Sequence, residues 1–258
     1  VVPSPYYEMF DPDHIELPAN FAFREARFEQ EWSRQIVSDL GEAATREFLR
    51  IYYASVKLVD DQVGRVLAAL DASGRSDDTI IVFTADHSDM AGGHGMVWKS
   101  TSAFYDEVAR VPLIIRYPRR IRPGRSAIAA NLTDLMLTLL DLAAEPAPSH
   151  VQGHSLAPYF LRGERDASQA PPYAFCERVG RARDGSRTVQ PGAPGSFMVR
   201  GSGWKYVRYA NRDEYLYDLT NDPGETRNLA KDAARQVQLE HLRSALDEWL
   251  VRTRYPGR

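Results

Sequence analysis

Hydrophobic side chains recur at three- and four-residue steps through residues 45–74, the spacing of one face of a helix. The positions concerned are Phe48, Ile51, Tyr52, Leu58, Val59, Val63, Val66, Leu67 and Leu70. The pattern predicts a long amphipathic helix that begins at about Thr45 and ends at Gly74. Residues 1–20 are rich in proline and aromatic side chains, which predicts an extended segment docked on the rest of the chain.

Two short runs are apolar on both faces, TIIVFTAD at residues 79–86 and VPLIIRYP at residues 111–118. Such runs are typical of buried parallel strands, which need further strands beside them and helices over them. A helix is expected over residues 131–144, with Thr133 as its N-cap. The first 160 residues offer hardly any other strand, so we expect the rest of the sheet to lie in sequence absent here.

The pattern changes after a polar stretch at residues 163–195, where we expect a domain boundary. Short aromatic strands follow at FMVRG, WKYVRYA and EYLYDL, separated by turn residues, and then a closing helix at residues 232–252. That helix is expected to bury one side, made of Val237, Leu242, Leu246, Trp249 and Leu250. The sequence therefore predicts an α/β part at residues 1–165 and a small α+β subdomain with an antiparallel sheet at residues 166–258.

Composition narrows the classes of protein. Of 258 residues, 32 are Lys or Arg and 35 are Asp or Glu, a net charge of −3, which argues against a basic nucleic-acid platform. No apolar run approaches the roughly 20 residues that span a bilayer. The single cysteine, Cys176, excludes an internal disulfide and a multi-cysteine zinc site. Without a signal peptide or an initiator Met, we expect the chain to begin partway into a longer protein; its compartment is not indicated, and an oligomer is possible.

The loop after the first apolar run contains the candidate metal-binding and catalytic residues. Ligands bind at the carboxyl ends of strands in open α/β sheets, and Asp86 and His87 stand at that end. A carboxylate and an imidazole there suit a divalent cation, while His94 and Lys99 can return toward it through a glycine-rich turn. The lysine would bind an anionic ester oxygen. A turn-forming aspartate, a loop-capping His94 and a solvated Lys99 remain equally simple interpretations of the residues alone.

Several segments, in order, resemble the formylglycine-dependent sulfatases of the alkaline phosphatase superfamily. They are IIVFTADHSDMAGGHGMVWKSTSAFYDEVARVPLIIRYP, NLTDLMLTLLDLAA with QGHSLAPYFLRG, and MVRGSGWKYVRY with EYLYDLTNDPGETRNLA. The resemblance implies part of an alkaline-phosphatase-like sandwich, with a central, mostly parallel sheet flanked by helices. It also implies that Asp86 and His87 bind the family's divalent cation, which is usually Ca²⁺. Because Ca²⁺ prefers oxygen ligands, a histidine at this position makes Mn²⁺ a second candidate. Lys99 would contact the sulfate as a catalytic and substrate-binding residue, and His94, from the Gly-x-His-Gly loop, would act at or next to the site.

The family's nucleophile is absent from the sequence. It is a Cys or Ser in a Cys/Ser-x-Pro-x-Arg motif, oxidised to formylglycine, and Cys176 lies instead in FCERV. The resemblance thus implies a C-terminal portion that cleaves sulfate esters only with an N-terminal sulfatase segment, from the same precursor or a second chain. Phosphate or phosphonate monoester hydrolysis on the same scaffold is one alternative, and a noncatalytic fragment or subunit is another.

Overall fold

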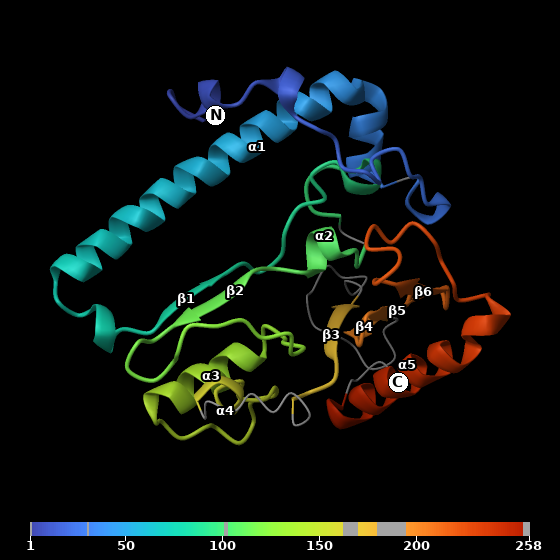
Figure 1. Ribbon diagram of the computed structural model, residues 1–258. Helices are drawn as coiled ribbons and strands as arrows, with labels where there is room; N and C mark the ends of the chain where they lie inside the picture. The colour runs from blue at the N-terminus through green and yellow to red at the C-terminus, as the bar shows by residue number, and fades with distance from the viewer. Residues whose placement is uncertain (1, 30, 101–102, 162–169, 180–194, 255–258) are drawn as a thin grey trace, which may run out of the picture. The chain divides into compact units, whose positions relative to one another are not determined.

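The computed structural model describes residues 2–29, 31–100, 103–161, 170–179 and 195–254 (Figure 1). The chain divides into two compact units, Val1–Arg119 and Arg120–Arg258. The boundary expected after residue 165 lies outside the described residues and stays a prediction. None of the described helices combines the length and the apolar character that a membrane span requires.

The first unit is built on one long helix, α1 (Trp32–Ala72), which begins 13 residues before the expected start at Thr45. The helix breaks at Gly41, whose φ of 76° lies in the left-handed region. The buried residues of its first segment include the polar Ser33 and Arg34 beside Val37. Because the buried face is partly polar there, the sequence shows no hydrophobic periodicity that would predict this part of the helix. At the other end Gly74 adopts a φ of 70° just past the helix, as expected of a helix-terminating glycine.

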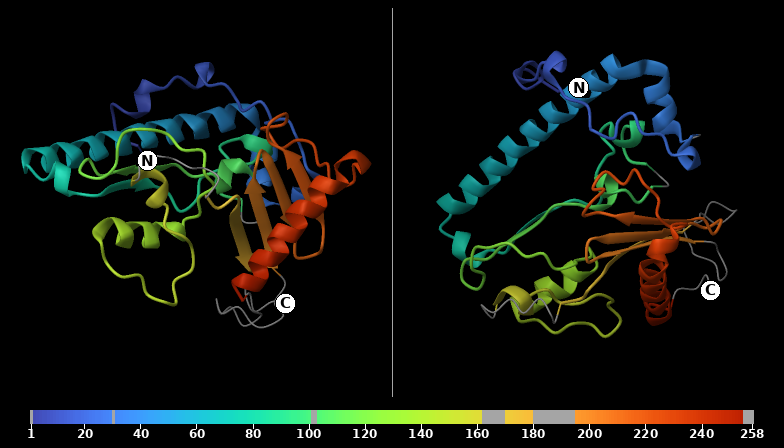
Figure 2. Two further views of the ribbon diagram at one scale, coloured as in Figure 1. Left: turned by 60° about the horizontal axis from the view of Figure 1, so that its bottom comes forward. Right: turned by 45° about the vertical axis from the view of Figure 1, so that its right-hand side comes forward.

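The N-terminal segment lies along α1, as expected of a docked segment, with three short 3₁₀ turns in it (Figures 1 and 2). The turns are η1 (Tyr7–Met9), η2 (Pro12–His14) and η3 (Ala26–Phe28). Two arginines of α1 fix the segment: Arg46 donates to the Ile15 carbonyl at 3.2 Å, and Arg50 donates to the Tyr7 carbonyl at 3.1 Å.

Strands β1 (Ile81–Thr84) and β2 (Leu113–Arg116) form a two-stranded sheet whose strands run antiparallel, so the expectation of two buried parallel strands is wrong for this pair. A parallel neighbour needs a crossover, usually a long helix, whereas the described part of the connection holds only short pieces, 3₁₀ turn η5 (Gly93–Gly95) and helix α2 (Asp106–Ala109). The strands are also not buried on both faces, since Phe83 is 45% exposed and Ile114 is 61% exposed.

In the second unit, α3 (Asp134–Ala143) and α4 (Pro158–Leu161) precede the sheet. Thr133 does not cap α3 as expected: its backbone is already helical, and its side chain makes no capping bond. The buried Asp134 organises this region instead, because its carboxylate accepts hydrogen bonds from the backbone N–H of Asn131 at 2.7 Å and of His154 at 2.9 Å.

The three expected aromatic strands are confirmed, and with one strand before them they form a four-stranded antiparallel sheet in the order β3-β4-β5-β6. Its strands are β3 (Ala174–Val179), β4 (Gly195–Gly201), β5 (Trp204–Arg208) and β6 (Glu214–Asp218). Helix α5 (Gln236–Arg252) covers one face of this sheet (Figure 2). The core between them contains Val199, Tyr206, Leu216, Leu239, Leu242, Leu246 and Leu250.

The prediction that Val237 lies on the buried side of the closing helix is wrong: Val237 is 86% exposed, and Leu239 takes its place in the core. The helix starts at Gln236, and steps of three and four residues from Leu239 reach the other core leucines, whereas Val237 lies off that stripe.

Candidate functional site

The loop after β1 folds back on itself because its two arms are hydrogen-bonded. The Met90 N–H donates to the Trp98 carbonyl, and the Gly92 N–H donates to the Met96 carbonyl, each at 2.8 Å. Gly92 and Gly95, at φ of 92° and 64°, supply the left-handed backbone that the turn requires. The fold of the loop therefore brings residues near its start beside residues near its end.

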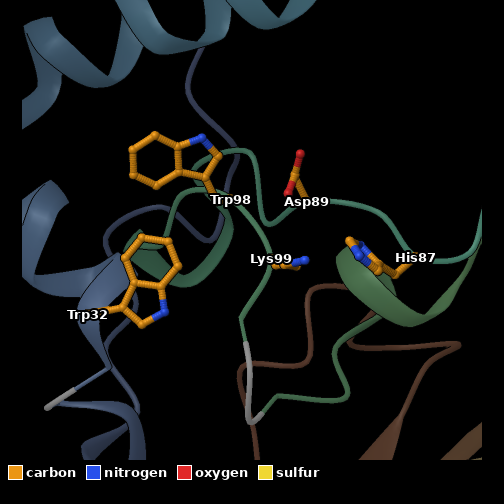
Figure 3. A pocket seen from close by; sticks show the side chains of 5 residues that line it. All are labelled: Trp32, His87, Asp89, Trp98 and Lys99. Carbon is orange, nitrogen blue, oxygen red and sulfur yellow. The ribbon is translucent and has the colours of Figure 1, made fainter.

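The result is a cavity of about 420 Å³ lined by Trp32, His87, Asp89, Trp98 and Lys99 (Figure 3). His87 and Lys99, twelve positions apart in sequence, thus share one cavity. Asp86 is not among the lining residues, but it adjoins His87, and its carboxylate is 88% exposed.

The Asp86 carboxylate is tied to its neighbour. One oxygen accepts the His87 backbone N–H at 2.8 Å, and the other lies 3.8 Å from His87 Nε2. The backbone hydrogen bond from His87 is the main cause that lowers the pKa of Asp86 below its ordinary value, and the charge of Lys99 acts in the same direction. Asp86 is therefore an anion at neutral pH, and it lies within electrostatic reach of the Lys99 ammonium.

His87 presents one nitrogen for a ligand. Its Nδ1 lies 3.1 Å from the Ser88 carbonyl oxygen, which is an acceptor only, so we place the proton on Nδ1. Nε2 then keeps its lone pair on the side of the Asp86 oxygen. This is the arrangement usual for a metal-ligating histidine, whose second ring nitrogen is held by a carbonyl or carboxylate.

The pair fits part of a metal shell. An oxygen and a nitrogen 3.8 Å apart can bind one cation at the roughly 2.0–2.6 Å bond lengths of divalent metals. Within the described ranges, no group of three or more His, Cys, Asp or Glu side chains gathers as a metal site would require. A Ca²⁺ ion takes roughly six to eight oxygen ligands, so a full shell needs donors beyond this pair.

His94 lies behind the loop and does not line the cavity. Its ring is fully buried, stacked on Tyr105 at a centroid distance of 3.6 Å and met edge-on by Phe23 at 5.5 Å. Nε2 lies 3.8 Å from a Glu107 carboxylate oxygen, and Arg34 donates to the His94 carbonyl at 3.2 Å. This environment suits a residue that fixes the loop, while Lys99 is exposed at its surface.

Three lining residues were missed by the sequence analysis: Trp32, Asp89 and Trp98. Trp98 directly precedes Lys99, and that adjacency was a visible signal. The contribution of Trp32 was not visible, because it depends on how the first turn of α1 meets the loop.

Comparison with known proteins places this geometry in a family. The Sulfatase family model matches residues 7–145, and a model of the C-terminal part of N-sulphoglucosamine sulphohydrolase matches residues 92–252. The chain belongs to the sulfatase family, and its mixed α/β fold is that of the alkaline-phosphatase-like superfamily.

Individual relatives agree with this assignment. The Δ4,5-hexuronate-2-O-sulfatase of Bacteroides thetaiotaomicron is 37% identical over 213 residues, which are 81% of this chain and 42% of the relative. A solved 2-O GAG sulfatase is 32% identical, with a TM-score of 0.75 over 93% of this chain and 53% of its own. A phosphonate monoester hydrolase from Silicibacter pomeroyi is 29% identical, with a TM-score of 0.82 over 97% of this chain and 53% of its own. The chain thus spans about half the length of the relatives it matches.

Proposed function

We propose that this chain carries the second half of the active site of a metal-dependent sulfuric ester hydrolase. The observation that supports it is the shared cavity, in which Lys99 and His87 face one space beside the ionised Asp86. A fixed ammonium next to a cation site is the chemistry that a sulfate ester requires, because negative charge has to be stabilised as the ester bond breaks.

Lys99 binds the sulfate group in this proposal. Its ammonium donates to sulfate oxygens and holds the ester in the cavity in one orientation. Because the charge of Lys99 is fixed before the reaction begins, little reorganisation is needed when charge on the sulfate oxygens rises.

Asp86 and His87 hold a divalent cation, Ca²⁺ or Mn²⁺, through a carboxylate oxygen and Nε2. When bound, the cation supplies Lewis-acid polarisation of the sulfate group. His94 keeps the loop in the conformation that holds Lys99 near this pair. The formylglycine nucleophile and the remaining cation ligands belong to an N-terminal sulfatase segment, from the same precursor or a second chain, so residues 1–258 alone do not turn over.

Hydrolysis of phosphonate or phosphate monoesters is the second candidate. The structural similarity of the chain to a solved phosphonate monoester hydrolase, with a TM-score of 0.82, supports this second candidate. Both anions are tetrahedral and would meet the same lysine, so the loop itself does not separate them.

The test compares 4-nitrophenyl sulfate with a 4-nitrophenyl phosphonate ester, using the whole protein and the 258-residue chain separately. We expect the whole protein to prefer the sulfate and the chain alone to show background rates. K99A should lower kcat/KM by at least about 100-fold, the loss typical of one transition-state donor, while K231A leaves it unchanged. A preference for the phosphonate would support the second candidate, and turnover by the chain alone would contradict the need for a second segment.

A further inference from the structure

The side chain of Lys99 is long and has no hydrogen-bond or ion-pair partner in the described part of the chain. It points toward His87 and away from Trp98 (Figure 3). A lysine side chain that nothing tethers samples many rotamers. The position of its ammonium therefore depends on how firmly the backbone at Lys99 is fixed.

That backbone is held on both sides of Lys99. Before it, the Trp98 carbonyl accepts the Met90 N–H at 2.8 Å. After it, the hydroxyl of the buried Ser100 accepts the Ala103 N–H at 3.1 Å. Trp98 has a φ of 52°, a left-handed conformation that bulky residues rarely adopt. Such a conformation persists only where the surrounding structure determines it, and this directs attention to the contacts of the Trp98 ring.

Two rings of helix α1 hold the indole of Trp98. Trp32 stacks on it with centroids 5.4 Å apart and planes 20° apart. Phe48 meets it edge-on at 5.4 Å with planes 85° apart. Phe48 is in turn packed against a small buried cluster made of Phe21, Val37 and Val97. The indole is thus contacted on its face by one ring and from another direction by a second ring that is itself supported.

The bend of α1 at Gly41 brings these two rings together. Trp32 and Phe48 are 16 positions apart, so a straight helix would separate them by roughly 24 Å along its axis. Gly41, with φ 76° and ψ −173°, changes the direction of the helix between them. The first segment of α1 therefore supplies the stacked ring, and the second segment supplies the edge-on ring.

We propose that Trp98 is the positioning residue of Lys99. Held by Trp32 and Phe48 in the bend of α1, the indole fixes the backbone from which the lysine reaches the sulfate group. The inference rests on the proposed function, because the role of Lys99 comes from it. The ammonium has to lie where charge develops on the ester, and a displacement on the order of 1 Å can lower a rate by about 100-fold.

Phe48 offers the sharpest test, because it contacts Trp98 but does not line the cavity. We expect F48A in the whole protein to lower kcat/KM for 4-nitrophenyl sulfate by about tenfold, through a looser Trp98 and a displaced Lys99. F48L keeps most of the apolar volume and should lose less than about threefold. Y53A removes another ring of α1, one that contacts Phe10, and should leave kcat/KM unchanged.

A double-mutant cycle shows whether Phe48 acts through Lys99. In the K99A background, F48A should lower kcat/KM further by less than about twofold, because no ammonium is left to position. A purely structural loss would be the same in both backgrounds. If F48A does not fold, W98A alone and in the K99A background supplies the same comparison.

NMR of the whole protein with ¹³C-methylated lysines follows the Lys99 side chain without turnover. Its signal is identified by its loss in K99A. The signal should become narrower in F48A, because the lysine then moves more freely, and should stay unchanged in Y53A. An unchanged Lys99 signal in F48A would overturn the inference.

The outcomes separate this inference from the proposed function. A wild-type rate for F48A beside a low rate for K99A, or losses that add in the double variant, would overturn the inference alone. A wild-type rate for K99A would overturn the proposed function, and a narrowed Lys99 signal in F48A would then leave the positioning by Trp98 standing.

Discussion

Asp86 has the features of a metal ligand although its side chain is largely open to solvent. The hydrogen bond from the His87 N–H lowers its pKa, so the carboxylate stays ionised until the pH falls below its ordinary value near ~3.9. A cation bound as proposed would therefore not lose this ligand to protonation at pH 5 or above.

We expect D86N to weaken Ca²⁺ or Mn²⁺ binding to the whole protein by at least about tenfold, because an anionic ligand is replaced by a neutral one. Titration calorimetry at pH 7 measures this directly. D60N removes an exposed carboxylate of α1 far from the loop in sequence and serves as the control. Unchanged affinity in D86N would exclude this residue as a ligand.

His94 has a different role, since its ring is buried and stacked on Tyr105. H94A should reduce the free energy of unfolding by about 2–4 kcal/mol through loss of a packed core ring. H14A, at a largely exposed position, should change it by less than about 0.5 kcal/mol. Urea denaturation of the chain measures both, and equal stabilities of H94A and H14A would show that the stack does not hold the loop.

Strand β5 is connected to the loop after β6 by a buried ion pair. Lys205 Nζ lies 2.8 Å from one Glu225 oxygen and 2.9 Å from the other, and neither side chain is more than 1% exposed. Removing one partner leaves an uncompensated buried charge.

E225A should therefore lower the free energy of unfolding by about 3–5 kcal/mol. The double variant K205M/E225A should recover much of that loss, because no charge is then left buried. The measurement is urea denaturation of both variants beside the wild type. A double variant as unstable as E225A would mean that the stabilisation comes from packing and not from charge pairing.

Helix α5 is held to β6 by Arg243, which donates to both oxygens of Glu214 at 3.0 and 2.9 Å. Burial opposes ionisation of Glu214, but the hydrogen bonds from Arg243 and Tyr206 and the nearby arginine charges outweigh it and lower its pKa. A lowered folded-state pKa means that this contribution is fully present above the unfolded pKa, near ~4.3, and is lost as the pH falls through the folded value.

E214Q should accordingly be less stable than the wild type at pH 7 and should approach it as the pH falls below about 4. Thermal melting from pH 7 to pH 3 follows this convergence. E248Q, on the exposed side of the same helix, should follow the wild-type curve throughout. A constant gap between E214Q and the wild type would contradict the ionisation account.

The elements with strong periodicity were predictable from sequence. The aromatic strands and the closing helix follow from alternation and from leucine spacing, and both are confirmed. The start of α1 was not predictable, because Arg34 is buried there and an arginine in a sequence is normally taken as a surface residue. Strand direction for β1 and β2 depends on the path of the connection, which local pattern does not contain.

The candidate site was predictable to a similar extent. Asp86 and His87 follow a strand end, a position that marks ligands in α/β sheets. The cavity shared by His87 and Lys99 depends on the left-handed turn of the loop. The stacking of Trp32 on Trp98 joins residues 66 positions apart, which no local pattern encodes.

For the molecule as a whole, the range matched by the Sulfatase family model, residues 7–145, contains the loop after β1 and the residues that line its cavity. The exposed apolar residues Phe83 and Ile114 of the two-stranded sheet agree with a further segment packing there, as the proposed function requires.

Anomalous X-ray diffraction from crystals of the whole protein grown with Mn²⁺ and a sulfate ester locates the cation and the anion together. We expect a manganese peak within about 2.0–2.5 Å of an Asp86 carboxylate oxygen and of His87 Nε2, with the sulfate group contacting both the metal and Lys99. A manganese peak elsewhere, or a sulfate group held away from Lys99, would contradict the account.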